Sequence, residues 1–118
     1  MKSNIITFHP RNMDDCLFCK ISKKEVPAEI VFENDDLVIF PDINPKAPRH
    51  YLIVPKKHID GVQGAAESDV LILGKMILAA KEQARQIGIK GYKLIFNVGR
   101  GGGQIIDHIH LHLLGFSQ

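Results

Sequence analysis

The sequence lacks the marks of several large protein classes. No apolar run approaches the roughly 18 residues that a membrane span needs, and residues 1–6 lack the apolar stretch and cleavage site of a secretory signal. The formal net charge is only +2, which is too small for the phosphate attraction of a non-specific nucleic-acid binder. We therefore expect a cytoplasmic protein that acts on neither membranes nor nucleic acids.

Cysteine is also scarce, and its two copies stand three positions apart as Cys16 and Cys19. In a reducing compartment this spacing indicates metal or redox chemistry before a structural disulfide. A thioredoxin-like redox pair opens a helix directly after a strand. No strand is predicted before Cys16, so metal binding is the favoured interpretation.

The apolar pattern predicts an α+β fold with an antiparallel sheet. Residues 1–14 follow neither the helical nor the strand period and are predicted to be a loose leader before a domain over 15–118. Within that domain the pattern predicts a short helix over 16–23, strands over 29–33, 37–40 and 50–55, a long helix over 68–87, and strands over 92–97 and 107–114.

Half of the six histidines fall within the last predicted strand, as His108, His110 and His112. Successive side chains of a strand point to opposite faces, so the three imidazoles share one face while Ile109, Leu111 and Leu113 share the other. Imidazole can act as nucleophile, acid, base or metal ligand near neutral pH. This segment is therefore the predicted reactive centre.

The segment resembles the signature of the histidine-triad family of nucleotide hydrolases and transferases, His-x-His-x-His followed by two apolar residues. The likeness to the Hint-like branch extends over residues 16–115, through the motifs Cys16-Leu-Phe-Cys19, Phe40-Pro-Asp-Ile-Asn-Pro45, Ala47-Pro-Arg-His50, Pro55-Lys-Lys-His58, Asn97 and Gly102-Gly-Gln104. It implies a HIT-like five-stranded antiparallel sheet with a short N-terminal helix and one long helix.

By this resemblance His110 is the nucleophile that attacks the α-phosphorus of a purine nucleoside 5′-phosphoramidate or similar phosphoester, and water opens the resulting nucleotidyl-histidine. A neutral imidazole can do so without a cofactor if its other nitrogen keeps a proton on a backbone carbonyl. His112 and His50 are expected beside the phosphate and leaving group, where a protonated imidazole can donate a proton. For His50, a core histidine at a strand start is the alternative.

The resemblance also implies a set of substrate-binding residues. These are Asp42 at the ribose hydroxyls, Leu17, Phe18, Ile21, Phe40 and Ile43 around the base, and Asn97, Gly103 and Gln104 at the phosphate. The five apolar residues are equally explained by core packing, and the glycine-rich segment by a hairpin turn. Ile105 stands where Hint-like proteins often have a serine, so only its backbone N–H can contribute there.

Cys16, Cys19, His58 and His108 form a predicted Cys2His2 set for structural zinc, as in some relatives. Two other functions remain open. Two histidines on one strand plus a third could instead hold catalytic zinc with an open position, and Ile105 leaves room for a nucleotide-binding adaptor with little catalysis. The family resemblance also implies a homodimer, formed through residues 92–97 and the long helix.

Overall fold

The chain folds into a five-stranded antiparallel sheet. Its side chains alternate between the two faces, and each face carries a hydrophobic core covered by a helix. The computed structural model describes residues 15–116. Its strands are β2 (Phe32–Glu33), β3 (Leu37–Pro41), β4 (Arg49–Pro55), β5 (Tyr92–Ile95) and β6 (Leu111–Gly115). Their order in the sheet is β2-β3-β4-β6-β5, so the last two strands of the chain extend the sheet from β4.

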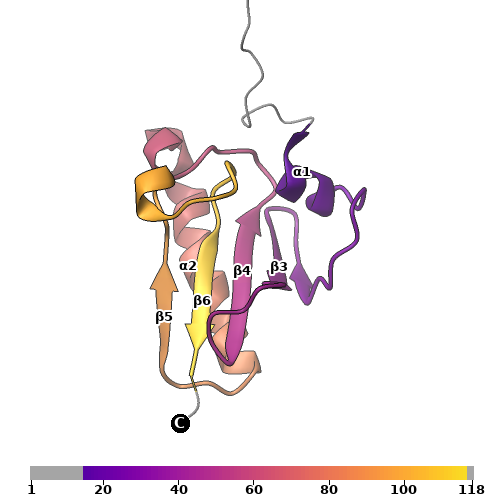
Figure 1. Ribbon diagram of the computed structural model, residues 1–118, viewed down its shortest axis with the longest axis vertical. Helices are drawn as coiled ribbons and strands as arrows, with labels where there is room; N and C mark the ends of the chain where they lie inside the picture. The colour runs from indigo at the N-terminus through magenta and orange to yellow at the C-terminus, as the bar shows by residue number, and fades with distance from the viewer. Residues whose placement is uncertain (1–14, 117–118) are drawn as a thin grey trace, which may run out of the picture.

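One face of the sheet is covered by the helix α2 (Val70–Gln86), which lies behind the sheet in Figure 1. Its buried residues Met76, Ala80 and Ala84 pack in one core cluster with alternate strand residues. The strand partners are Leu37, Ile39, Ile53, Leu111 and Leu113, and Ile109 joins them from the segment just before β6. Gly88 ends the helix at φ 77°, a left-handed conformation that favours glycine.

The opposite face carries the short helix α1 (Leu17–Ser22). Phe18 and Ile21 pack there with the strand residues that point away from α2, namely Val38, Phe40, Leu52 and Val54. Cys16 caps the helix, because its Sγ accepts a hydrogen bond from Cys19 N at 3.4 Å. The histidine-bearing face of β6 is this face, so α1 and the histidines share one side of the sheet.

The predicted fold class and the order of elements are confirmed. The hairpin between β2 and β3 is confirmed too, and Asn34 Oδ1 closes it by accepting from the N–H groups of Asp36 and Leu37, each at 2.8 Å. None of the helices described between residues 15 and 116 is both long and apolar enough to cross a membrane. The leader predicted for residues 1–14 lies outside the described residues.

Several boundaries were predicted wrongly, among them the end of the strand expected over 92–97, which stops at Ile95. The strand expected over 107–114 begins only at Leu111, because Ile109 N donates to Ile59 O at 2.6 Å and the backbone there pairs with a loop instead of a strand. The strand expected over 29–33 is reduced to β2. A 3-10 turn (Glu67–Asp69) precedes α2, and the Asp69 carboxylate caps that turn by accepting from Ala66 N at 2.9 Å.

Candidate active site

A cleft of about 850 Å³ opens on the α1 face of the sheet. Most of the residues that the sequence predicts for catalysis and substrate binding line it: Leu17, Phe18, Ile21, Phe40, Asp42, Ile43, His50, Asn97, Gly103, Ile105, His110 and His112. Ile43 and Ile105 are exposed at 91% and 79% and so lie at its rim. The cleft therefore combines an apolar wall from α1 and β3 with a polar end that carries three histidines.

His110 is buried at that polar end with one ring nitrogen anchored. Its Nδ1 lies 2.7 Å from the carbonyl oxygen of His108. A carbonyl can only accept, so Nδ1 carries the proton and Nε2 keeps its lone pair. The Phe18 ring meets the imidazole edge to face, with centroids 5.1 Å apart. Burial lowers the pKa of His110, which keeps the ring neutral at pH 7.

His112 and His50 continue from His110 as a row of imidazoles, which we call the imidazole row. Ring centroids are 5.0 Å apart between His110 and His112 and 5.2 Å apart between His112 and His50. Lys46 N donates to His50 Nδ1 at 3.0 Å, so the His50 proton is at Nε2. That Nε2 lies 2.9 Å from His112 Nδ1, which must accept, and the proton of neutral His112 is therefore at Nε2.

The row is neutral in the free cleft. Burial is the largest cause that lowers the pKa of His112 to about 4, and the neighbouring His110 and His50 lower it further. Burial also lowers the pKa of His50, against the opposing charge of Asp42. Protonated helpers at pH 7 therefore require an additional negative charge in the cleft, such as a bound phosphate.

Asp42 joins the row from the end of β3. Its Oδ2 lies 3.4 Å from His50 Nε2, and its Oδ1 accepts from Asn44 N at 2.8 Å. Asp42, His50 and His112 place one ligand atom each within 4.8 Å of one another, as a metal site would. However, the 2.9 Å contact between the two imidazoles is shorter than the roughly 3.3 Å separating two nitrogens on tetrahedral zinc, and it suits a shared proton better.

The glycine-rich loop before the signature is braced by Asn97. Asn97 Nδ2 donates to Gly102 O at 2.9 Å. Gly103 follows with φ 89°, and a Cβ there would meet Asn97 Nδ2 at 3.5 Å, so a larger residue would be strained chiefly by this backbone conformation. Asn97 and Gly103 both line the cleft, and the Asn97 hydrogen bond braces the loop between them.

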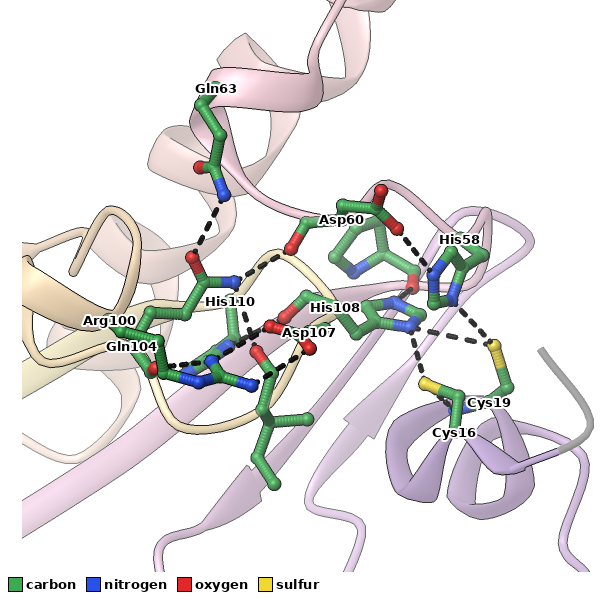
Figure 2. Close-up of polar contacts among 12 residues, drawn as sticks. Cys16, Cys19, His58, Asp60, Gln63, Arg100, Gln104, Asp107, His108 and His110 are labelled. Carbon is green, nitrogen blue, oxygen red and sulfur yellow. Dashed lines mark hydrogen bonds and ion pairs between the residues drawn. The ribbon is translucent and has the colours of Figure 1, made fainter. Parts of the chain in front are cut away.

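Gln104 does not line the cleft. Its side chain is buried and joins three segments: Nε2 donates to Asp60 O at 2.7 Å and to Ile106 O at 3.0 Å, and Oε1 accepts from Gly99 N at 2.9 Å. Figure 2 shows this amide between the glycine-rich loop and the segment that carries His58. The Gln104 side chain therefore holds these segments together. Contact between Gln104 and a substrate phosphate stays a prediction.

Sequence reasoning gave no role to Arg100, which clamps the same loop. Its guanidinium forms two parallel bonds of 2.9 Å to the carboxylate of Asp107, and its Nη1 donates to Gln104 O at 2.6 Å (Figure 2). A planar guanidinium matches a carboxylate in this way, which fixes geometry as well as charge. Opposite charges seven positions apart in an irregular loop give no periodic signal by which to find the pair.

Cys16, Cys19, His58 and His108 converge at the N-terminal end of α1, and we call them the metal cluster (Figure 2). Cys16 Sγ lies 3.2 Å from His108 Nδ1, and Cys19 Sγ lies 3.3 Å from His58 Nδ1 and 3.5 Å from His108 Nδ1. Zinc bond lengths imply ligand separations of about 3.3–3.8 Å around a tetrahedral ion. The donor types and spacing therefore fit zinc.

Both histidines of the metal cluster are anchored by their outer nitrogen. His108 Nε2 donates to Pro55 O at 2.8 Å, and His58 Nε2 lies 3.0 Å from Asp60 Oδ1. Zinc-ligating histidines typically have such oxygen partners, which fix the tautomer and leave the other nitrogen for the metal. Neither partner was predicted from the sequence. Asp60, two positions after His58, was a detectable signal, whereas a backbone carbonyl is not.

In the absence of a cation, the surroundings of Cys19 disfavour its thiolate. Burial, followed by the hydrogen bond and charge of Cys16, raises the pKa of the Cys19 thiol to about 12. A bound divalent cation reverses such a shift because it stabilises the thiolates directly. Binding of such a cation would therefore release the proton of the Cys19 thiol.

Comparisons with known proteins agree with this architecture. A family model described as "Scavenger mRNA decapping enzyme C-term binding" matches residues 15–118. The chain is 47% identical over 104 residues to Protein HitA of Neisseria gonorrhoeae, which covers 87% of this chain and 97% of that protein. It is 44% identical over 114 residues to the 14 kDa zinc-binding protein of Zea mays, covering 92% and 88%. A HIT family hydrolase from Legionella pneumophila Philadelphia 1 matches in structure with a TM-score of 0.85 and 48% identity over 87% of this chain and 94% of that one.

The chain belongs to the histidine-triad family. In this histidine-triad protein the three signature residues have different surroundings: His108 faces thiols, His110 faces a carbonyl, and His112 faces another imidazole. One maize relative is named as zinc-binding, and the present chain has a Cys2His2 set that fits zinc. His108 belongs to the metal cluster by its ring and holds His110 by its backbone carbonyl, so a single residue joins the two sites.

Proposed function

We propose that this histidine-triad protein hydrolyses purine nucleoside 5′-phosphoramidates and related phosphoesters at the α-phosphorus. The observation that carries the proposal is the 2.7 Å hydrogen bond from His110 Nδ1 to the His108 carbonyl, which leaves Nε2 unprotonated. A neutral imidazole with a fixed lone pair, beside a cleft of nucleotide size, is suited to displacement at phosphorus.

In the first step, His110 Nε2 bonds to the α-phosphorus while the bond from phosphorus to the leaving nitrogen breaks. The negative phosphate raises the pKa of the adjacent His112, which takes up a proton and passes it to the departing nitrogen. In the second step, water attacks phosphorus, the bond to His110 breaks, and the proton of the water returns to His112. The products are a free amine and a nucleoside monophosphate, and the reaction needs no cofactor.

The rest of the cleft supports a nucleoside. We assign Asp42 to the ribose hydroxyls because its carboxylate remains partly accessible, with 20% of the side chain exposed. Leu17, Phe18, Ile21, Phe40 and Ile43 would enclose the base, and an apolar slot of this kind suits the flat face of a purine. Asn97, Gly103 and the backbone at Gln104 and Ile105 would face the phosphate.

We assign the metal cluster a structural zinc ion, held by Cys16, Cys19, His58 and His108. Four protein ligands leave no open position for substrate, which distinguishes a structural from a catalytic site. When bound, the ion would stabilise two thiolates and tie α1 to the segment before β6. Two buried thiols at this spacing also suit a reducing compartment, so we place the protein in the cytoplasm.

We propose a homodimer formed through α2 and the edge strand β5. Val70, Leu71 and Leu78 of α2 are exposed at 64%, 75% and 63%. Leu94 of β5 is exposed at 36%, and within residues 15–116 this strand pairs on one side only. A second copy would bury these side chains and satisfy the strand edge. A single-chain mass in sedimentation at micromolar concentration would contradict the dimer.

The deciding experiment is mass spectrometry of the protein mixed with adenosine 5′-phosphoramidate. We expect an added mass of one adenylyl group on the native chain, and none on His110→Ala, whose turnover should fall roughly a thousandfold or more. Lys90→Ala, at an exposed residue outside the cleft lining, is the control and should retain the adduct. Equal turnover by the native protein and His110→Ala would rule out the proposal.

A nucleotide-binding adaptor is the second candidate, and the exposed Ile105 is the observation that favours it. An isoleucine side chain offers no hydroxyl to a phosphate, so turnover could be weak while binding persists. Tight binding of AMP or GMP together with negligible turnover of phosphoramidates, adenylates and dinucleoside polyphosphates would favour the adaptor. If Ile105→Ser restored turnover, the result would favour the hydrolase over the adaptor.

A further inference from the structure

Lys46 gives the cleft a permanent positive charge. Among the cleft-lining residues within 15–116, it is the one lysine or arginine. Burial lowers the pKa of His50 and His112, so these two imidazoles do not supply a permanent charge in the free protein. An anionic substrate entering the cleft therefore meets a single fixed cation.

Lys46 lies at the far end of the imidazole row from the nucleophile. The row runs from His110 to His112 to His50, and Lys46 N donates to His50 Nδ1 at 3.0 Å. Lys46 therefore stands next to His50, which together with His112 is expected beside the phosphate and the leaving group.

The ammonium group of Lys46 is available for a ligand. Lys46 is exposed, and none of the ion pairs formed among residues 15–116 includes Lys46. The nearby carboxylate of Asp42 is instead engaged by Asn44 N and faces His50. Burial is the main cause of the lowered pKa values of His50 and His112, and the Lys46 charge adds to both shifts, so the ammonium is close enough to act on this end of the cleft.

We propose that Lys46 binds an anionic group on the leaving part of the substrate, so that the protein prefers nucleotides whose leaving group carries a carboxylate or phosphate. This inference rests on the proposed function, since it concerns the leaving group of the same reaction. The backbone N–H of Lys46 holds His50 whatever the side chain is, so the charge can be changed without removing that hydrogen bond.

The test uses two substrates that differ by one charge: AMP joined through a P–N bond to β-alanine, and the same compound with β-alaninamide. We expect the native protein to favour the carboxylate, and Lys46→Met to reduce the ratio of the two kcat/KM values about three- to tenfold. Lys46→Arg should keep the ratio. Lys90→Met, an exposed lysine outside the cleft lining, is the matched control and should leave the ratio unchanged. The native preference should shrink as salt is raised, because the charges are near solvent.

A binding measurement provides a readout that is independent of turnover. The ratio of ADP to AMP affinity should also fall in Lys46→Met, since the second phosphate stands for the anionic leaving group. An equal change for both substrates and both nucleotides would mean that Lys46 serves the α-phosphate and would overturn the inference. The same holds if neither ratio changes.

The two proposals fail in different ways. If the native protein turns over both substrates but Lys46→Met changes neither the kcat/KM ratio nor the affinity ratio, the leaving-group assignment is wrong and the hydrolase proposal stands. If neither substrate forms an adduct with His110, the hydrolase proposal fails, and the ADP to AMP ratio still decides whether Lys46 recognises the second anionic group.

Discussion

The metal cluster and the imidazole row use the same side chain and anchor it by opposite nitrogens. In the cluster, His108 and His58 are held at Nε2 by oxygen partners and present Nδ1 to the thiols. In the row, His110 is held at Nδ1 and keeps Nε2 for the cleft. His110 stands two positions after His108, yet the chemistry of the two residues differs. The oxygen that anchors each ring, and not the histidine itself, decides whether it suits a metal or phosphorus.

The largest effect should come from breaking the cluster while leaving the row intact. Cys16→Ser removes a thiolate ligand, so bound zinc should fall below about half an equivalent per chain. The free energy of unfolding should drop by at least about 2 kcal/mol, or roughly 10 °C in Tm, because metal binding contributes to folding. Metal analysis and thermal melts measure the two quantities.

His110→Gln is the complementary variant. It changes the row and should keep both zinc and Tm close to native values while activity disappears. Full zinc occupancy in Cys16→Ser would show that the cluster is not the metal site. Loss of zinc in His110→Gln would show that the two sites are not separate.

Much of this comparison was predictable from the sequence. The alternation of His110 and His112 with Leu111 and Leu113 assigned the two faces correctly, because side-chain direction in extended backbone depends only on position. The spacing of Cys16 and Cys19 similarly predicted a cluster at the start of a helix.

Backbone partners were not predictable. Pro55 O anchors His108, Lys46 N orients His50, and Ile59 O holds Ile109, and every residue type offers the same main-chain groups. The last strand was predicted to start too early for the same reason. Its apolar pattern does not reveal that the backbone at Ile109 pairs with a loop and not with a strand. The buried position of Gln104 depends on three segments that meet only in the folded chain.

The second prediction tests the anchor of the cluster. Asp60→Asn weakens the acceptor 3.0 Å from His58 Nε2, so zinc affinity should fall about 10- to 100-fold. Competition with a chromophoric chelator measures this change. Asp42→Asn removes a carboxylate beside the row instead, and it should leave zinc affinity unchanged. Equal affinities for native and Asp60→Asn proteins would show that the anchor does not tune the metal.

A third prediction concerns the neutral state of the row. Unfolded histidine titrates near pH 6.5, whereas folded His112 has a pKa of about 4. The unfolded chain thus binds more protons between these values, and stability should fall as pH decreases from 6.5 toward 4. In His112→Asn this contribution is absent. The Tm of the variant should therefore decline less steeply from pH 7.0 to 5.5, with zinc present throughout. Parallel declines would contradict a buried neutral His112.

The smallest effect is expected from the clamp between the two sites. Asp107→Asn breaks the paired bonds to Arg100, whose side chain is 58% exposed, so the stability loss should stay within about 1 kcal/mol. The loop that contains Gly103 and Ile105 would lose one brace, and kcat/KM should fall about two- to threefold. Arg85→Gln breaks a more exposed pair with Glu82 on α2, outside the cleft lining, and is the control. A similar stability loss without any change in kcat/KM is expected there. If the two variants reduce kcat/KM alike, the Arg100 clamp has no specific part in holding the loop.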